Sequence, residues 1–322
     1  MKKFMAFLFI IAVSFFLPGF QNVSHAGVKT KAALICMNWS DVHWIKIKHG
    51  ALARVEEFAL RGHDIDLMCL APENYDIEKQ IEMVRQAIEA KVKYIIIACP
   101  DAEALNGVLK EASDAGIKII YVDSPATFPA SVTYATDNFA AGAEVGRYLQ
   151  KTLEADGISN GIIGIINTNE NSESCHKRID GFVSAFKDTK FMFVTQTYSD
   201  TDSSRAKEIA KGMIENGIAA IFGVDNYATI GATAAIRETT ALNGKKPSCV
   251  GWDASDENAS ALEDGSLSAC LIQIPWYMGA MAISAVVDME QGTEMNGLFS
   301  ESGYILVTQE NFKLPEYAAM DF

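Results

Sequence analysis

The sequence predicts an α/β protein made of two similar doubly wound parallel-sheet lobes. Short runs rich in β-branched residues alternate with amphipathic stretches of helical period along most of the 322 residues. This alternation is typical of parallel sheets wrapped by helices. The pattern breaks once and restarts, and polar side chains stand where the strands end. These two observations favour two lobes that share one site.

The expected strands fall into two groups. The first group covers residues 32–37, 65–70, 94–98 and 118–122, and the second covers 162–166, 191–197, 219–224, 249–252 and 269–274. Most of them are followed by a predicted helix, the clearest at 44–60, 77–90, 102–115, 139–153, 204–215 and 276–290. The last two helices end before Asn216-Gly217 and Gln291-Gly292, because glycine takes up the backbone conformation that ends a helix.

A break around residues 125–131 separates the two groups, and the second begins near Ile162. The hydrophobic content of 49% is enough for two cores of ordinary size. No low-complexity linker lies between the groups. We therefore expect several short crossings between the lobes, which is the arrangement of a hinge.

The N-terminal segment predicts export to the periplasm. Lys2 and Lys3 precede an apolar run from Phe4 to about Phe20, and Ser24-His25-Ala26 places small residues at a cleavage site. We expect residues 1–26 to be a signal peptide that is removed before Gly27. The first cysteine, Cys36, stands too late for a lipoprotein signal. An uncleaved membrane anchor is the alternative.

The charge excludes some partners. Removing Lys2 and Lys3 takes the formal net charge from −14 to −16, which repels phosphate backbones and anionic membrane surfaces. The sequence has no basic stripe and no helix-turn-helix or zinc-finger spacing. Nucleic acid is therefore not an expected partner.

Six cysteines stand mainly in or beside the apolar strands, so buried free thiols are the expectation. Pairing of Cys36 with Cys69, or of Cys249 with Cys270, stays open. No cysteine or histidine spacing is typical of a metal site, so neither a metal nor a cofactor is expected.

Polar residues stand where the predicted strands end, and all of them face one edge of the fold. They are Asp41, Asp123, Asp225, Asp253 and Gln273. In doubly wound sheets ligands bind beyond the carboxyl ends of the strands, so polar groups from both lobes would line one cleft. The alternative for each aspartate is a helix N-cap, but capping does not account for Gln273.

The residue types at this edge suit the recognition of hydroxyl groups. A carboxylate accepts from two vicinal hydroxyls, while an arginine such as Arg178 donates to the same oxygens. Trp44, beside His43, offers an aromatic face for the C–H surface of a ring. The alternatives are a core anchor for Trp44 and a solvated surface side chain for Arg178.

At these residues the sequence resembles the type I periplasmic sugar-binding proteins, the ribose- and galactose-binding group that shares its fold with the effector domains of LacI-type repressors. The resemblance covers nearly the whole mature chain. Its strongest segments are 33–38, 41–44 with 50–51, 119–123, 134–138 with 141–142, 178–182, 221–226 with 230–231, 250–253 and 271–275.

The resemblance implies the site and the division of the chain. Asp41, His43, Trp44 and Asp123 would line the wall of the first lobe, opposite Arg178, Asp225, Asp253 and Gln273. Three crossings would form the hinge of this type I periplasmic binding protein fold. The N-terminal lobe would comprise residues 27–136 and 274–301, and the C-terminal lobe residues 137–273 and 302–322.

Three departures from the family pattern argue against plain ribose or glucose as the ligand. Ser124 stands where ribose binders have a second arginine, and His43 replaces the first of two aromatic residues that sandwich the sugar ring. The second-lobe aromatic is absent near Thr201, which leaves Tyr198 or Tyr227 as substitutes. A modified sugar, polyol, cyclitol or furanose-like signalling molecule stays open.

The predicted function is that of a periplasmic solute-binding protein of an ABC transporter. It would capture a monosaccharide, polyol or related ligand by hinge closure and act as a monomer. The resemblance implies an ABC permease as partner, with a chemoreceptor as a further candidate. The alternative is a ligand sensor that presents a sugar-like signal to a membrane receptor. An enzyme is not expected, because the sequence has no nucleophile elbow or phosphate loop. A transcriptional regulator is not expected either, because a DNA-binding headpiece is missing.

Overall fold

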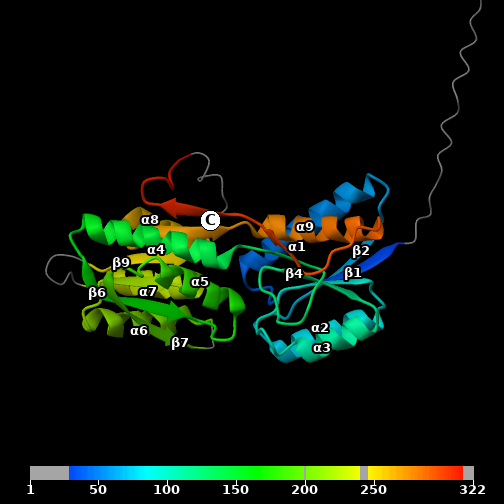
Figure 1. Cartoon of the computed structure of the whole chain (residues 1–322), viewed down its shortest axis with the longest axis horizontal. Helices are drawn as coiled ribbons and strands as arrows, with labels where there is room; N and C mark the ends of the chain where they lie inside the picture. The colour runs from blue at the N-terminus through cyan, green and yellow to red at the C-terminus, as the bar shows by residue number, and fades with distance from the viewer. Residues whose placement is uncertain (1–28, 199–200, 240–245, 315–322) are drawn as a thin grey trace, which may run out of the picture.

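The computed structural model describes residues 29–198, 201–239 and 246–314. In this part of the chain two α/β lobes lie end to end, each built on a six-stranded sheet (Figure 1). The predicted signal peptide, residues 1–26, lies outside the described residues.

The first lobe has the strand order β11-β5-β4-β3-β1-β2, with all neighbouring strands parallel. Its elements are β1 (Thr30–Ile35), α1 (Val42–Ala59), β2 (Ile65–Leu70), α2 (Ile77–Glu89), β3 (Tyr94–Ile97), α3 (Asn106–Asp114), β4 (Lys118–Val122), β5 (Val132–Ala135), α9 (Pro275–Glu290) and β11 (Leu298–Glu301).

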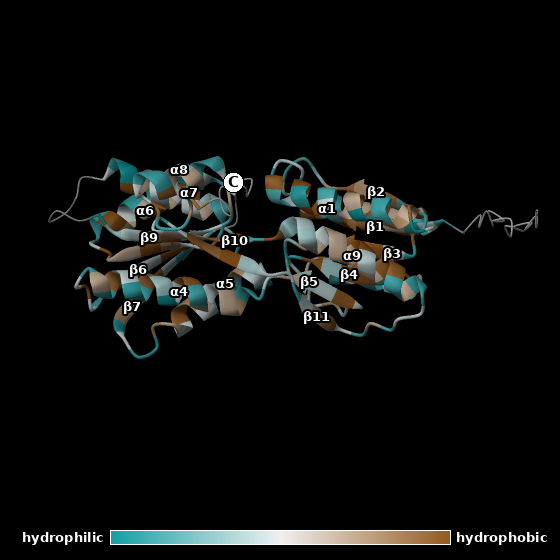
Figure 2. Cartoon of the chain, turned by 90° about the horizontal axis from the view of Figure 1, so that it is seen from above, coloured by the Kyte–Doolittle hydropathy of each residue, from teal (hydrophilic) through white to brown (hydrophobic). Residues whose placement is uncertain are grey.

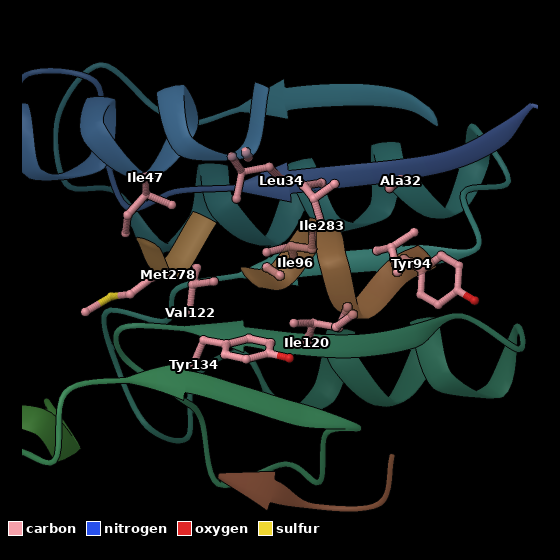
Figure 3. Close-up of a cluster of buried hydrophobic side chains, with 14 of the residues drawn as sticks. Ala32, Leu34, Ile47, Tyr94, Ile96, Ile120, Val122, Tyr134, Met278 and Ile283 are labelled. Carbon is pink, nitrogen blue, oxygen red and sulfur yellow. The ribbon is translucent and has the colours of Figure 1, made fainter. Parts of the chain in front are cut away.

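Alternation along the strands divides the core of this lobe between two layers of helices. Ala32 and Leu34 of β1 face α1 and α9, where they meet Ile47, Met278 and Ile283 (Figure 3). The intervening Ala33 and Ile35 belong to a separate buried cluster with side chains of α2 and α3. Because successive side chains of a strand point to opposite faces, both faces are apolar and the sheet is buried on both sides.

The second lobe repeats this plan with the order β12-β10-β9-β8-β6-β7, in which only β12 is antiparallel to its neighbour. Its elements are α4 (Asn138–Ala155), β6 (Asn160–Asn167), α5 (Glu173–Ser184), β7 (Lys190–Thr197), α6 (Ser203–Glu215), β8 (Ala220–Gly223), α7 (Asn226–Glu238), β9 (Ser248–Trp252), α8 (Asp256–Asp264), β10 (Ala269–Gln273) and β12 (Tyr304–Thr308). Helices α4 and α5 contribute to one core layer, and α6, α7 and α8 to the other.

The chain passes between the two sheets three times. It leaves β5 for α4 through residues 136–137, β10 for α9 through Ile274, and β11 for β12 through residues 302–303. Figure 2 shows how close β5 and β10 come to the gap between the lobes. Two doubly wound lobes joined by three short crossings confirm the predicted fold class.

The nine predicted strands are all present, and β5, β11 and β12 are strands that the sequence pattern did not indicate. Helix α5 contains Arg178, and α7 and α8 are helices for which the sequence pattern gave no bounds. The predicted helix at 102–115 was wrong at its start, because α3 begins only at Asn106. The Asp101 carboxylate accepts from the backbone N–H groups of Glu103 and Ala104, at 2.8 Å each, and holds this segment as a turn.

Candidate ligand-binding site

A cavity of about 540 Å³ lies between the lobes, beyond the carboxyl ends of the strands. Its size is in the usual range for a small-molecule site. The structure brings all eight predicted site residues to its wall, namely Asp41, His43, Trp44, Asp123, Arg178, Asp225, Asp253 and Gln273.

Two of the predicted aspartates are helix N-caps. Asp41 Oδ1 accepts from the backbone N–H of His43 at 2.9 Å at the start of α1, and Asp225 Oδ1 accepts from that of Ala228 at 3.0 Å at the start of α7. Asp225 Oδ2 accepts the hydroxyl hydrogen of Thr168 at 2.5 Å. The capping alternative therefore holds for these two residues, although both also line the cavity.

Asp123 and Asp253 are different, because each follows a strand without capping a helix. Both have a left-handed backbone, with φ 61° at Asp123 and 65° at Asp253. Their N–H groups donate to the neighbouring strand, at 2.8 Å to the Tyr134 carbonyl and 2.7 Å to the Leu271 carbonyl. A residue other than glycine rarely takes this conformation, and such strain is concentrated at functional sites.

His43 is paired with Asp123 in the first lobe. Its Nε2 lies 3.1 Å from Asp123 Oδ1, and its ring meets that of Trp44 edge-on at a centroid distance of 4.8 Å. Burial lowers the pKa of His43, but Asp123, and more weakly Asp253 and Asp41, raise it, so that the pKa is about 9. Burial also raises the pKa of Asp123, but His43 and Arg178 outweigh it and leave that pKa below its usual value. The pair is therefore ionic at neutral pH.

Arg178 of α5 is buried at the cavity wall, with 4% of its surface exposed. Its Nε donates to Asn138 Oδ1 at 2.8 Å and its Nη1 to the Val224 carbonyl at 3.1 Å, while the guanidinium lies 4.3 Å from the centre of the Trp252 ring. These contacts fix the plane of the guanidinium and leave further N–H groups for a ligand. The surface-arginine alternative for Arg178 is therefore wrong.

Close packing of two helices places Arg178. A Cβ on Gly142 of α4 would lie 2.2 Å from the Arg178 carbonyl oxygen, and one on Gly181 of α5 would lie 2.0 Å from the Phe139 carbonyl oxygen. Only glycine lets the two backbones come this near. The pair of glycines thus sets the depth at which the guanidinium stands in the cavity.

Asp253 and Gln273 form a second polar pair in the second lobe. Gln273 Nε2 donates to Asp253 Oδ1 at 2.8 Å, and Gln273 is only 5% exposed. Gln273 Oε1 has no hydrogen-bond partner among the described residues. Burial raises the pKa of Asp253, and burial also raises that of Asp225.

The two lobes touch across the cavity mouth. Asn169 Nδ2, which follows β6 in the second lobe, donates to the Tyr75 hydroxyl at 2.7 Å and to the Pro100 carbonyl at 2.9 Å in the first. The Ala102 N–H donates to the Asn171 carbonyl at 3.2 Å. We call this contact between 75, 100–102 and 169–171 the latch. Asn169 follows the end of β6, so the strand-end rule places it at this edge of the sheet, but the sequence pattern did not indicate its contact with the first lobe.

The positions that depart from the family pattern also line the cavity. Ser124 is 2% exposed and its Oγ lacks a partner among the described residues. Thr201 and Tyr227 line the cavity too, and the Tyr227 hydroxyl bonds to the Asp41 side chain. Tyr198 does not, because its hydroxyl donates to the Asp202 carbonyl at 3.0 Å beside α6. Of the two proposed substitutes for the missing aromatic, only Tyr227 lies in the cavity.

All six cysteines are free thiols, and only Cys175 lines the cavity. Burial raises the pKa of Cys175 to about 11, so the thiol is neutral and unreactive. Between residues 29 and 314, in the segments that the structure describes, no cluster of His, Cys, Asp or Glu is arranged to hold a metal ion. None of the described helices is long and apolar enough to cross a membrane.

The chain is similar to proteins of a known family. A model of the periplasmic binding protein domain matches residues 33–294. The chain belongs to the periplasmic binding protein family. The resemblance to type I periplasmic sugar-binding proteins is thereby confirmed. Members of this family bind ligands and are not enzymes.

Two relatives match most of this periplasmic binding protein. The ribose import binding protein RbsB of Escherichia coli is 23% identical over 314 residues, covering 96% of this chain and 99% of RbsB. The D-ribose/D-allose-binding protein of Pseudomonas aeruginosa is 25% identical over 302 residues, covering 90% of this chain and 92% of the relative.

Solved structures show the same fold. A carbohydrate transporter solute-binding protein from Agrobacterium radiobacter, in complex with D-arabinose, matches with a TM-score of 0.80 at 22% identity, covering 90% of this chain and 98% of that one. An ABC transporter solute-binding protein from Agrobacterium vitis, bound to α-D-tagatopyranose, matches equally well at 20% identity, with the same coverage of both chains.

Proposed function

We propose that this periplasmic binding protein captures a monosaccharide, polyol or related small polyhydroxylated molecule between its lobes and delivers it to an ABC permease. The observation that carries the proposal is the meeting of Asp123, Asp253 and Arg178 in one cavity, with both aspartates in a left-handed backbone conformation. Relatives named for ribose and fold neighbours solved with bound sugars support it.

Nine residues of the cavity wall divide the recognition between them, namely the eight predicted ones and Tyr227. The carboxylates of Asp123 and Asp253 accept from ligand hydroxyls, and the free N–H groups of Arg178 donate to them. Trp44, His43 and Tyr227 supply aromatic surface for the C–H faces of a ring. Asp41, Asp225 and Gln273 hold these groups in place and add acceptors at the cavity wall.

Closure of the lobes completes the site. Ligand docks on one lobe, and rotation about the three crossings brings the other lobe against it. The latch then closes the mouth, so that water is excluded and the polar contacts gain strength. A permease recognises the closed pair of lobe surfaces.

The proposal includes the location and organisation of the protein. Residues 1–26 act as a signal peptide, and the mature protein works in the periplasm as a monomer. The hinge divides it into a lobe of residues 27–136 and 274–301 and a lobe of residues 137–273 and 302–322. N-terminal sequencing of the mature protein tests the cleavage before Gly27, and light scattering tests the monomer.

A thermal-shift screen of the mature protein tests the binding function. Pentoses, hexoses, polyols, inositols and amino sugars are compared, because a ligand that binds only the folded state raises the melting temperature. A hit is followed by small-angle scattering, where closure decreases the radius of gyration. If no compound shifts the melting temperature, the proposal is wrong. Cells that lack the permease separate transport from presentation to a chemoreceptor. Transport predicts that these cells no longer take up the ligand, and presentation predicts that their uptake is unchanged.

A further inference from the structure

The wall of the cavity carries more negative than positive groups. Five carboxylates line it, from Asp41, Asp101, Asp123, Asp225 and Asp253, against the cations of His43 and Arg178. His43 is matched by Asp123 at 3.1 Å. Arg178 donates to neutral acceptors, the Asn138 side chain and the Val224 carbonyl. By formal charge, five carboxylates against two cations give the cavity wall a surplus of three negative charges.

Unsatisfied acceptors mark where this surplus can be met. Gln273 Nε2 faces Asp253 Oδ1, because an amide donor and not an amide oxygen must face a carboxylate. This orientation leaves Gln273 Oε1 without a donor, although only 5% of the surface of Gln273 is exposed. Asp253 Oδ2 accepts no hydrogen bond from the described residues. Asp253 and Gln273, which both line the cavity, thus each carry an acceptor that no donor among the described residues satisfies.

We infer that the natural ligand is a polyhydroxylated amine, such as an amino sugar or an aminocyclitol, whose ammonium group binds at Asp253 and Gln273. The inference rests on the proposed function and specifies its substrate class. An ammonium has three N–H donors and a positive charge, so it satisfies both acceptors and reduces the charge surplus. A hydroxyl supplies one donor and leaves the charge unbalanced. An anionic sugar, such as a sugar phosphate, adds to the surplus and is rejected.

Matched ligand pairs test the inference. Calorimetry at pH 7 compares glucosamine, galactosamine and an inosamine with glucose, galactose and inositol, and with the N-acetylated amines, which keep the nitrogen but lose the charge. At least one amine is expected to bind about tenfold or more tightly than both its parent and its N-acetyl form, the factor that a charged hydrogen bond supplies.

The outcomes separate the two proposals. If neutral sugars or polyols bind as tightly as the amines, the inference is wrong and the proposed function stands. If nothing in either set binds, both are overturned.

An Asp253→Asn variant locates the ammonium. Asparagine keeps an acceptor for Gln273 Nε2 and tolerates the left-handed backbone, so the substitution removes the charge alone. The preference for the amine over its parent is expected to fall by about tenfold or more. Asp188→Asn is the matched control, since Asp188 is exposed between α5 and β7 and does not line the cavity. A preference that survives Asp253→Asn unchanged would overturn the assignment of the amine to this pair.

Discussion

His43 Nε2 lies 3.1 Å from Asp123 Oδ1, which ties the first turn of α1 to the end of β4. This ion pair fixes the wall of the cavity before any ligand arrives. Carboxylates face the imidazole from several elements, since Asp41 precedes it on its own helix and Asp253 approaches from the second lobe. Arg178 is the cation that faces Asp123 from that lobe.

The ion pair predicts a loss of stability at alkaline pH. The pKa of His43 is about 9 in the folded protein against an ordinary value of 6.5, so its contribution is complete below 6.5 and is lost as pH rises to about 9. The free energy of unfolding should fall by roughly 3 kcal/mol over this window. Denaturant unfolding between pH 6 and 10 measures it, with His43→Gln as the comparison. Equal slopes for the wild type and the variant would contradict the prediction.

The Asp253→Asn variant should stabilise the ligand-free protein. Burial raises the pKa of Asp253, so the folded state disfavours the charged carboxylate at all pH values above the ordinary pKa of 3.8. Removing the charge should raise the melting temperature by roughly 2–4 °C, the shift that about 1 kcal/mol produces in a chain of this size. The gain should shrink as pH falls toward 4, and a gain independent of pH would exclude this cause.

Gly142→Ala should displace Arg178. The new Cβ would lie 2.2 Å from the Arg178 carbonyl oxygen, so α4 and α5 must separate. We expect a loss of about 1–3 kcal/mol in unfolding free energy from overpacking, together with weaker ligand binding. Gly212→Ala is the control, because its Cβ meets nothing within 4 Å in α6 and the substitution should stabilise by up to about 1 kcal/mol. Unchanged affinity in Gly142→Ala would show that the helix contact does not position Arg178.

Tyr75→Phe should weaken the latch. The variant keeps the ring but removes the hydroxyl that accepts from Asn169 and donates to the Pro100 carbonyl at 3.2 Å. A hydrogen bond of about 0.5–1.5 kcal/mol predicts about 2–10-fold weaker binding, mainly through faster dissociation. Scattering of the ligand-bound variant should show a larger radius of gyration than that of the ligand-bound wild type. Tyr121→Phe is the control, because it removes a hydroxyl-to-carbonyl bond within the first lobe and should leave the radius unchanged.

The strand ends could be predicted from sequence because of how parallel sheets are built. Strands such as β4 and β9 run in one direction, so the residues after them, Asp123 and Asp253, must reach the same edge of their sheets. The edge strand β11 could not be predicted in this way, because it has only four residues, two of them polar, and none of them is fully buried. Strand β12, Tyr304–Thr308, does carry an apolar run like those of the central strands, but it was not among the strands predicted.

The roles of the individual aspartates were less predictable. Asp41 and Asp225 are caps because a helix starts directly after each, whereas Ser255 caps α8 and leaves Asp253 free for the cavity. The latch depends on how two separate lobes meet. No local pattern around Tyr75 or Asn169 carries that information, because the contact joins residues 94 positions apart in the chain.

Helix α9 belongs to the first lobe but is synthesised after nearly all of the second. It covers β1 and α1 with Met278, Ile283 and Val286, all fully buried. Until these residues have been made, the first lobe exposes the apolar face that they cover, so it cannot complete its core as an independent folding unit. The lobe that begins first therefore completes its core only after most of the second lobe has been made. A chain that stops before Pro275 would yield an aggregating fragment rather than half of a working protein.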